Sequence, residues 1–372
     1  MSSVNFACSY TGVYRTIRFG SATQSAKNVI DKQSTDILYL NQKDLLALGG
    51  GNSSLYVEAV EQALKQHAAG SIVQPLKPYL RAPNSHIADR IIAMPAALLA
   101  EPAVSGLKWI GSKHDNPTLR GIERASALIT LNDPKTNYPI AIMEGSLISG
   151  MRTAAVTVIA AKHLAVSGFS RIACIGCGPI AKMQLSAMLE QFPQIKNIRL
   201  YDIDPKKALD LSKNLKQRFP QVNVEVSSNA RTAIKSPQGD SQVLINCTVV
   251  DKPYIPFSWL PRGIFVSNIS IMDLNKDVFL NADKVLVDDW KQNDREKKVI
   301  NQLVEEGRFS KNNLHAELGE VVSGRKPGRE HPDEIIILNP IGMAIEDIAS
   351  AHKFYEKAIS QGNIGTRLSL YG

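Results

Sequence analysis

The spacing of apolar and polar positions divides the chain into two regions. Up to about residue 143, short apolar runs lie among polar and proline-punctuated stretches, a pattern typical of a strand-rich region. The strands and helix expected there cover 36–40, 90–96, 104–109, 127–132 and, for the helix, 55–69. From 145 to about 289, strand-like runs alternate with helical patterns, which predicts a Rossmann-type, doubly wound parallel sheet. A strand over 334–338 and a helix over 344–358 are expected to return to the first region.

A glycine-rich turn follows the apolar run at 171–175 and leads into a helical pattern. Gly176, Gly178 and Ala181 have the spacing of the dinucleotide-binding fingerprint, with alanine where a third glycine often stands. The first glycine permits a tight turn, the second lets the backbone approach a pyrophosphate, and the small third residue lets helix pack on strand. Free amides at the helix start then bind the anion. The alternative is a glycine-rich turn in another kind of α/β unit.

Asp202, at the end of the next apolar run, is the acid expected after such a fingerprint. A carboxylate there accepts hydrogen bonds from ribose hydroxyls and repels a 2′-phosphate, so the sequence favours NAD over NADP. Polar residues near the carboxyl ends of the other strands are further candidates. The residues expected to contact NAD are Gly176, Gly178, Pro179, Ile180, Ala181, Asp202, Thr153, Thr248, Ser267 and Asn268.

The composition is that of an ordinary globular chain, with 44% hydrophobic and 21% charged residues among 372. This length is sufficient for two domains. No apolar run reaches the roughly 18 residues of a membrane-spanning helix, so no membrane partner is expected. The net charge of +8 comes from scattered basic residues. It therefore favours an anionic substrate plus a dinucleotide over nucleic acid.

Cys174 and Cys177 form a C-x-x-C pair across the strand end and the phosphate loop. In that position we expect them to pack or to act as spacers, in preference to redox chemistry or zinc binding. The cysteine usage fits a reducing compartment, which predicts a cytoplasmic location.

The first 35 residues differ from the rest, since no Asp or Glu occurs before Asp31. This composition is also found in transit peptides, but no clear amphipathic helix accompanies it. We therefore interpret residues 1–35 as a loosely attached or disordered N-terminal arm.

Several segments occur in a characteristic order after residue 36. They are 106–110 (GLKWI), 132–133 (ND) with 138–139 (YP), 152–155 (RTAA), 176–181 (GCGPIA), 316–320 (AELGE), 324–329 (GRKPGR) and 341–347 (IGMAIED). In this order they resemble the ornithine cyclodeaminase/μ-crystallin family. The resemblance implies an NAD-binding domain over 146–330. It also implies a substrate-binding and homodimerisation domain of α+β type, formed by 36–145 together with 331–372.

Three further segments, 121–126 (GIERAS), 267–270 (SNIS) and 339–342 (NPIG), resemble one branch of that family. This branch makes 2,3-diaminopropionate for siderophores or peptide antibiotics. It cleaves N-(2-amino-2-carboxyethyl)-L-glutamate oxidatively, with NAD and water. The segment 271–273 reads Ile-Met-Asp, where cyclodeaminases usually have Gly-Ala-Asp, so the sequence departs from the cyclodeaminase pattern.

The resemblance also implies three active-site roles. Arg152 would bind the α-carboxylate of the substrate through its guanidinium fork, and Lys108 would be the second cation. Asp273 would be the catalytic carboxylate that handles protons as an imine forms and hydrolyses. Each residue has a structural alternative: a helix-surface arginine, a lysine reaching water from a strand edge, and a helix N-cap, respectively.

A substrate with three carboxylates needs additional cations. Arg81, Arg90 and Arg124 are the candidates, with Arg90 the best placed, although each could instead form a surface salt bridge. We expect no metal, because His86, His114 and His163 form no metal-like grouping in the sequence.

Other functions remain open at this stage. An ornithine cyclodeaminase, a ketimine reductase and an alanine dehydrogenase belong to the same family. A non-catalytic dinucleotide- or ligand-binding protein of the μ-crystallin type belongs to another functional class, and the presence of Lys108, Arg152 and Asp273 argues against it.

Overall fold

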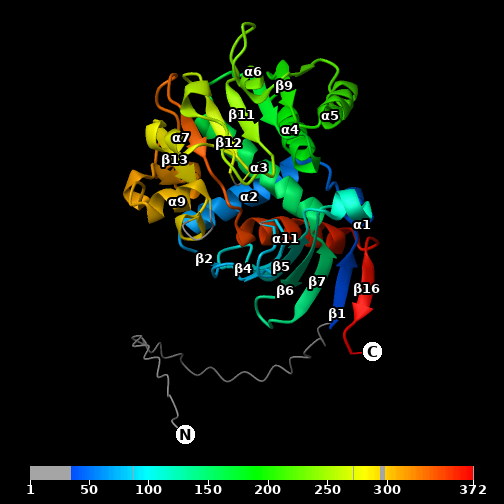
Figure 1. Ribbon diagram of the computed structural model, residues 1–372. Helices are drawn as coiled ribbons and strands as arrows, with labels where there is room; N and C mark the ends of the chain where they lie inside the picture. The colour runs from blue at the N-terminus through cyan, green and yellow to red at the C-terminus, as the bar shows by residue number, and fades with distance from the viewer. Residues whose placement is uncertain (1–34, 87, 271, 294–297, 372) are drawn as a thin grey trace. The chain divides into compact units, whose positions relative to one another are not determined.

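Two β-sheets organise the computed structural model, which describes residues 35–86, 88–270, 272–293 and 298–371 (Figure 1). The first sheet has the strand order β16-β1-β7-β6-β5-β4-β2, and β3 also pairs with β4. Its strands are β1 (Asp36–Leu40), β2 (Ile72–Val73), β3 (Tyr79–Leu80), β4 (Arg90–Leu98), β5 (Val104–Ser112), β6 (Ala125–Asn132), β7 (Pro139–Glu144) and β16 (Thr366–Ser369). Antiparallel pairing runs from β4 to β7, so this sheet is a meander with added edges.

The second sheet has the order β10-β9-β8-β11-β12-β15-β13-β14. All of its pairs are parallel. Its strands are β8 (Arg171–Ile175), β9 (Asn197–Tyr201), β10 (Asn223–Val226), β11 (Val243–Asn246), β12 (Phe265–Asn268), β13 (Lys284–Val287), β14 (Ala316–Glu317) and β15 (Ile336–Leu338). Strand order reverses between β8 and β11, the kind of switch point at which α/β sheets bind ligands. The predicted fold class is confirmed.

Helix α3 (Ser146–Leu164) joins the two sheets, because it packs against β6 of the first and β12 of the second. Helix α11 (Ala344–Gln361) covers one face of β4, β5 and β6. The other helices are α1 (Gln42–Ala47), α2 (Ser53–Ala68), α4 (Pro179–Gln191), α5 (Pro205–Arg218), α6 (Ala230–Ile234), α7 (Lys276–Asn281), α8 (Trp290–Asn293), α9 (Val299–Glu305) and α10 (Leu318–Val322). One continuous apolar core, which includes Leu131 of β6 and Ile172 of β8, serves both sheets.

The topology corrects the expected return of 331–372 to the first region. Strand β15 pairs with β12 and β13 in the second sheet, and only α11 and β16 belong with the first. The hydrophobic run Ile336–Leu338 is buried on both faces, as a central parallel strand requires. The division into two domains otherwise stays a prediction. The N-terminal arm lies outside the described residues, and none of the described helices has both the length and the apolar character needed to cross a bilayer.

Candidate active site

Two predicted cations meet on one buried carboxylate that comes from a third element. Lys108 of β5 donates to Asp347 Oδ2 at 2.6 Å, and Arg152 of α3 donates through Nε to Asp347 Oδ1 at 3.0 Å. Lys108 also reaches Ser149 Oγ at 3.1 Å. Lys108 is only 1% exposed, so it does not extend to water from a strand edge. The structure therefore brings Lys108 and Arg152 together, with Asp347 of α11 between them.

Glu346, beside Asp347 on α11, is a second acid in this cluster. Arg152 donates to Glu346 Oε2 at 2.7 Å, and the same oxygen caps the helix by accepting from Met343 N at 3.1 Å. Burial raises the pKa of Glu346 to about 7, and burial lowers the pKa of Lys108 to about 7. Within the described residues, Glu346 Oε1 is buried without a hydrogen-bond partner. Sequence reasoning quoted both acids as part of a motif but gave them no role.

The loop before α11 forms a rigid wall behind Arg152. Lys77, which is buried, donates to the carbonyls of Ile341 (3.2 Å) and Gly342. From the other side, Asp288 Oδ2 accepts from the amides of Ile341 (2.9 Å) and Gly342 (2.5 Å). Gly342 has φ +78°, and a Cβ there would lie 2.6 Å from Arg152 Nη1. Only glycine fits this turn so close to the guanidinium.

Asp273 lies in a separate group. Its Oδ1 accepts from Thr248 Oγ1 at 2.6 Å and from Tyr254 Oη at 3.0 Å. The side chain is fully buried, which raises its pKa. Its Oδ2 has no hydrogen-bond partner in the described part of the chain. Asp273 is not a helix N-cap, because α7 begins after Asn275. Sequence reasoning missed Tyr254.

The glycine-rich turn has the geometry that a dinucleotide requires. Gly176 has φ +87°, and a Cβ there would lie 2.7 Å from the carbonyl carbon of Cys247. At Gly178 a Cβ would meet none of the described residues within 4 Å, which leaves open space in front of the α4 N-terminus. Among the described residues no side chain caps that terminus, so its amides are available to an anion. Ala181 is fully buried, as close packing of helix on strand predicts.

Asp202 sits beside this turn at the end of β9. Its Oδ2 accepts from Cys177 N at 2.7 Å and its Oδ1 from Asp204 N at 2.9 Å, so the carboxylate is fixed in place. Each oxygen keeps a second lone pair for a ribose hydroxyl. The neighbouring Ile203 is 91% exposed and offers an apolar surface next to the turn.

The other predicted cofactor contacts are bonded inside the protein. Ser267 Oγ lies 2.8 Å from Thr157 Oγ1, and Asn268 Nδ2 donates to Asn339 Oδ1 at 2.7 Å; both predicted residues are buried. Thr153 Oγ1 donates to the carbonyl of Ser149 within α3 at 2.7 Å. These hydrogen bonds stabilise the strand end and the helix. Direct contact of Ser267, Asn268 and Thr153 with NAD stays a prediction.

The three additional arginines gather around the open end of β4 and β5. The guanidiniums of Arg81 and Arg90 lie 5.7 and 5.4 Å from the ring centroid of Tyr79. Burial, together with the charge of Arg90, lowers the pKa of Arg124. Arg90 pairs with Ser112, and by strand alternation it points to the same sheet face as Lys108. Arg90 therefore has both Arg81 and Arg124 nearby, and we refer to these three arginines as the cationic rim.

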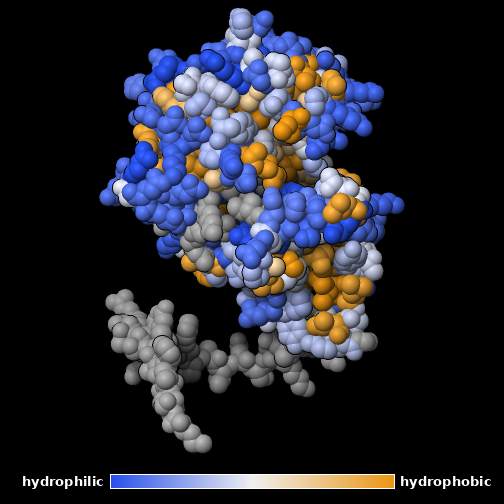
Figure 2. Space-filling view, viewed as in Figure 1, coloured by the Kyte–Doolittle hydropathy of each residue, from blue (hydrophilic) through white to orange (hydrophobic). Residues whose placement is uncertain are grey.

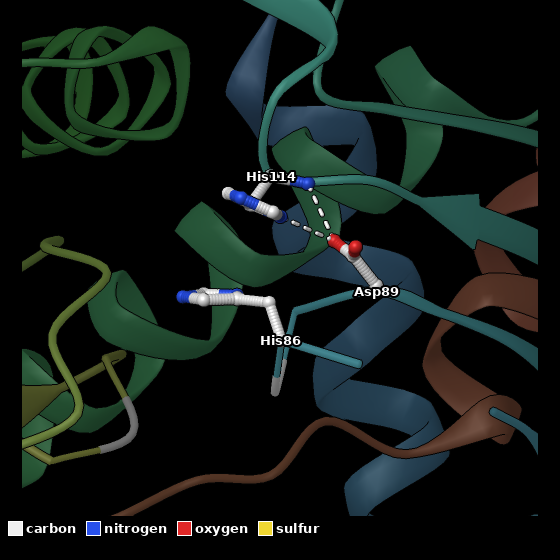
Figure 3. A group of neighbouring side chains, drawn as sticks. All are labelled: His86, Asp89 and His114. Carbon is white, nitrogen blue, oxygen red and sulfur yellow. Dashed lines mark hydrogen bonds and ion pairs between the residues drawn. The ribbon is translucent and has the colours of Figure 1, made fainter. Parts of the chain in front are cut away.

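One expectation about histidines was wrong. His86 and His114 lie together with Asp89, and one donor atom from each falls within 4.8 Å of the others (Figure 3). Their separation in the sequence hid this grouping, since it depends on the pairing of β4 with β5. His163, on α3, is not a member of the group.

Comparisons with known proteins identify the family of this chain. The profile of the ornithine cyclodeaminase/mu-crystallin family matches residues 50–362. The N-((2S)-2-amino-2-carboxyethyl)-L-glutamate dehydrogenase of Staphylococcus aureus is 57% identical over 338 residues, which are 90% of this chain and 99% of that protein. The fold matches a Thermococcus litoralis Δ1-pyrroline-2-carboxylate reductase in complex with NADH and L-proline (TM-score 0.82, 30% identity, 89% of this chain, 100% of that chain). It also matches an archaeal alanine dehydrogenase dimer with bound NAD (TM-score 0.80, 31% identity, 90% of this chain, 100% of that chain).

Proposed function

Because this chain belongs to the ornithine cyclodeaminase/mu-crystallin family, we propose that it is an NAD-dependent oxidoreductase acting on a CH–NH bond. Its substrate is N-(2-amino-2-carboxyethyl)-L-glutamate, which it converts with NAD and water to 2,3-diaminopropionate, 2-oxoglutarate and NADH. The observation that carries this proposal is the identity shared with the Staphylococcus aureus dehydrogenase over almost the whole of that protein. The products would serve siderophore or peptide-antibiotic biosynthesis, in the cytoplasm.

Arg152 and Lys108 bind substrate carboxylate in this proposal. Each is already paired with Asp347, which offsets the cost of burying its charge and fixes its position. Lys108 keeps a third N–H beyond its two protein acceptors, and Arg152 keeps the N–H groups of Nη2. The cationic rim of Arg81, Arg90 and Arg124 takes the more distant carboxylates. Three acidic groups on the substrate account for this many cations.

Asp273 handles the protons of the reaction. When bound, NAD supplies the hydride acceptor, and the open turn around Gly178 leaves room for it. Loss of hydride from the glutamate-side Cα and of the amine proton leaves a C=N bond. Water adds to that carbon, and the hemiaminal then splits its C–N bond to release the amine and the 2-oxo acid. The unpartnered Oδ2 of Asp273 is the acceptor for a proton from that water.

The first sheet supports a homodimer through its outer face. Trp109 (42% exposed) and Leu128 (49%) are direct neighbours across β5 and β6, with Ile91 (36%) on β4 nearby. Figure 2 shows exposed hydrophobic side chains over β7 and its neighbouring strands. Such a face is typical of subunit contacts. Trp109→Glu should convert a dimer to a monomer in light scattering, and a wild-type monomer would contradict the dimer.

The direct test is NADH absorbance with purified protein, NAD and N-(2-amino-2-carboxyethyl)-L-glutamate, beside ornithine, proline and alanine. We expect NADH only with the first compound, together with 2-oxoglutarate. Proline formed from ornithine without net NADH would identify a cyclodeaminase instead. NADH from alanine, or activity only with cyclic imines in the reverse direction, would identify an alanine dehydrogenase or a ketimine reductase. NAD binding without any turnover would point to a non-catalytic binding protein.

A further inference from the structure

Three metal-ligating side chains lie together outside the buried charge cluster. His86 and Asp89 precede β4, and His114 follows β5. Because Arg90 pairs with Ser112 in antiparallel strands, the segment that precedes Arg90 and the segment that follows Ser112 lie side by side. Figure 3 shows the two imidazole rings face to face, with the carboxylate beside His114. Two imidazoles and one carboxylate form a donor set that suits zinc and other late first-row dications.

Asp89 is held in place by its neighbours. It accepts from His114 N at 2.7 Å and from Lys113 Nζ at 2.9 Å, and its Oδ1 lies 2.8 Å from His114 Nδ1. For all three residues to bind one ion, His114 must ligate through the Nδ1 that faces Asp89, so the ion replaces the contact between these two atoms.

The two rings are already close and can move. Their centroids are 4.3 Å apart with an interplanar angle of 25°, and the His114 side chain is 45% exposed. His86 is exposed too, and its Nδ1 accepts one bond, from Ala88 N at 3.1 Å. Zinc–nitrogen bonds of about 2.0–2.1 Å place tetrahedral ligands roughly 3.3 Å apart. The three donor atoms lie within 4.8 Å of one another, so rotation of the two exposed rings is enough to bring them to that spacing.

Lys113 is the local competitor for the ion. Its ammonium occupies Asp89 Oδ2, but its side chain is 49% exposed, so this surface pair is weak and easily replaced. Lys113 and the adjoining Arg90 are both positive and oppose a cation. The expected affinity is therefore moderate, and it should increase when the ammonium is removed.

We propose that His86, Asp89 and His114 form a binding site for a zinc-class dication, distinct from the cluster of Lys108 and Arg152. The bound ion ties the segment before Arg90 to the segment after β5. It thus fixes the end of the sheet that carries the cationic rim. Water completes the coordination from the exposed side of the rings.

The test is a titration of untagged full-length protein with Co²⁺, followed by its visible d–d absorption, and then displacement by Zn²⁺. One Co²⁺ should bind per chain. His86→Ala and His114→Ala should each weaken binding by at least about tenfold. His331→Ala, which removes another exposed histidine, should match wild type. Lys113→Ala should bind more tightly, an effect that a cluster without a metal role would not produce. Circular dichroism checks that each variant is folded.

The proposal would be overturned by the absence of saturable Co²⁺ binding, by wild-type affinity in both single histidine variants, or by weaker binding in Lys113→Ala. A thiolate-to-cobalt charge-transfer band that persists in the histidine variants would identify cysteine as the ligand. That outcome would also overturn it.

Discussion

Replacing Gly342 by alanine tests whether the wall behind Arg152 positions the substrate. Gly342 has φ +78°, where a non-glycine residue costs about 1–2 kcal/mol. Its new Cβ would lie 2.6 Å from Arg152 Nη1 and 2.9 Å from Nη2. Non-bonded atoms need about 3.5 Å, so the guanidinium must retreat by roughly 1 Å. The retreat disturbs its 2.7 Å bond to Glu346.

We expect Gly342→Ala to bind substrate more weakly while it remains folded. A misplacement of about 1 Å can cost about 100-fold, so kcat/KM should fall by about 10–100-fold. Most of the change should be a higher KM, because Arg152 holds a carboxylate in both the ground state and the transition state. The free energy of unfolding should fall by about 1–2 kcal/mol.

Gly362→Ala is the matched control. Gly362 has φ +74°, and a Cβ there would meet no atom of the described part of the chain within 4 Å. This variant should lose similar stability in urea unfolding but keep the wild-type KM in the NADH assay. If Gly342→Ala and Gly362→Ala have the same kinetics, the loop does not position Arg152 and the reasoning is wrong.

Three further predictions concern the acids and the turn. Asp273→Asn keeps an oxygen that accepts the hydrogen bond from Thr248 but loses the negative charge, so turnover should fall by about 100-fold or more. Fluorescence titrations should show unchanged NADH binding, and lost NADH binding would indicate a structural role instead. The pKa of Glu346 is raised from 4.5 to about 7, so its stabilising contribution is complete below pH 4.5 and is lost as pH rises to about 7. Glu346→Gln should therefore show a shallower fall in unfolding free energy over that window, and an unchanged slope would refute the assignment. Gly178→Ala should fold normally but bind NAD more weakly. Gly176→Ala should lose both normal folding and NAD binding, because its new Cβ would clash with the backbone of Cys247. Equal behaviour of the two variants in calorimetry would contradict this account.

The sequence identified only some residues of the buried charge cluster, and their positions in the chain explain why. Lys108 and Arg152 carry family motifs, and the sequence alone identified them. Their partner Asp347 lies 239 and 195 residues further along, on a helix whose packing face no local pattern reveals. The sequence did not predict the burial of Lys77, because a lysine in a proline-rich stretch is usually exposed to solvent. Its burial follows only from the loop that folds over it.

The sequence by itself determined the class of fold and the dinucleotide turn. Strand and helix periodicities are local, and the Gly176–Ala181 spacing encodes a turn and a packing contact within one strand–helix unit. Tertiary structure decided the remainder: the place of β15 in the second sheet, the apolar core shared by both sheets, and the grouping of His86 with His114. Each of these depends on strand order and register between distant segments. Those are set by which buried faces fit together, and side-chain periodicity does not specify them.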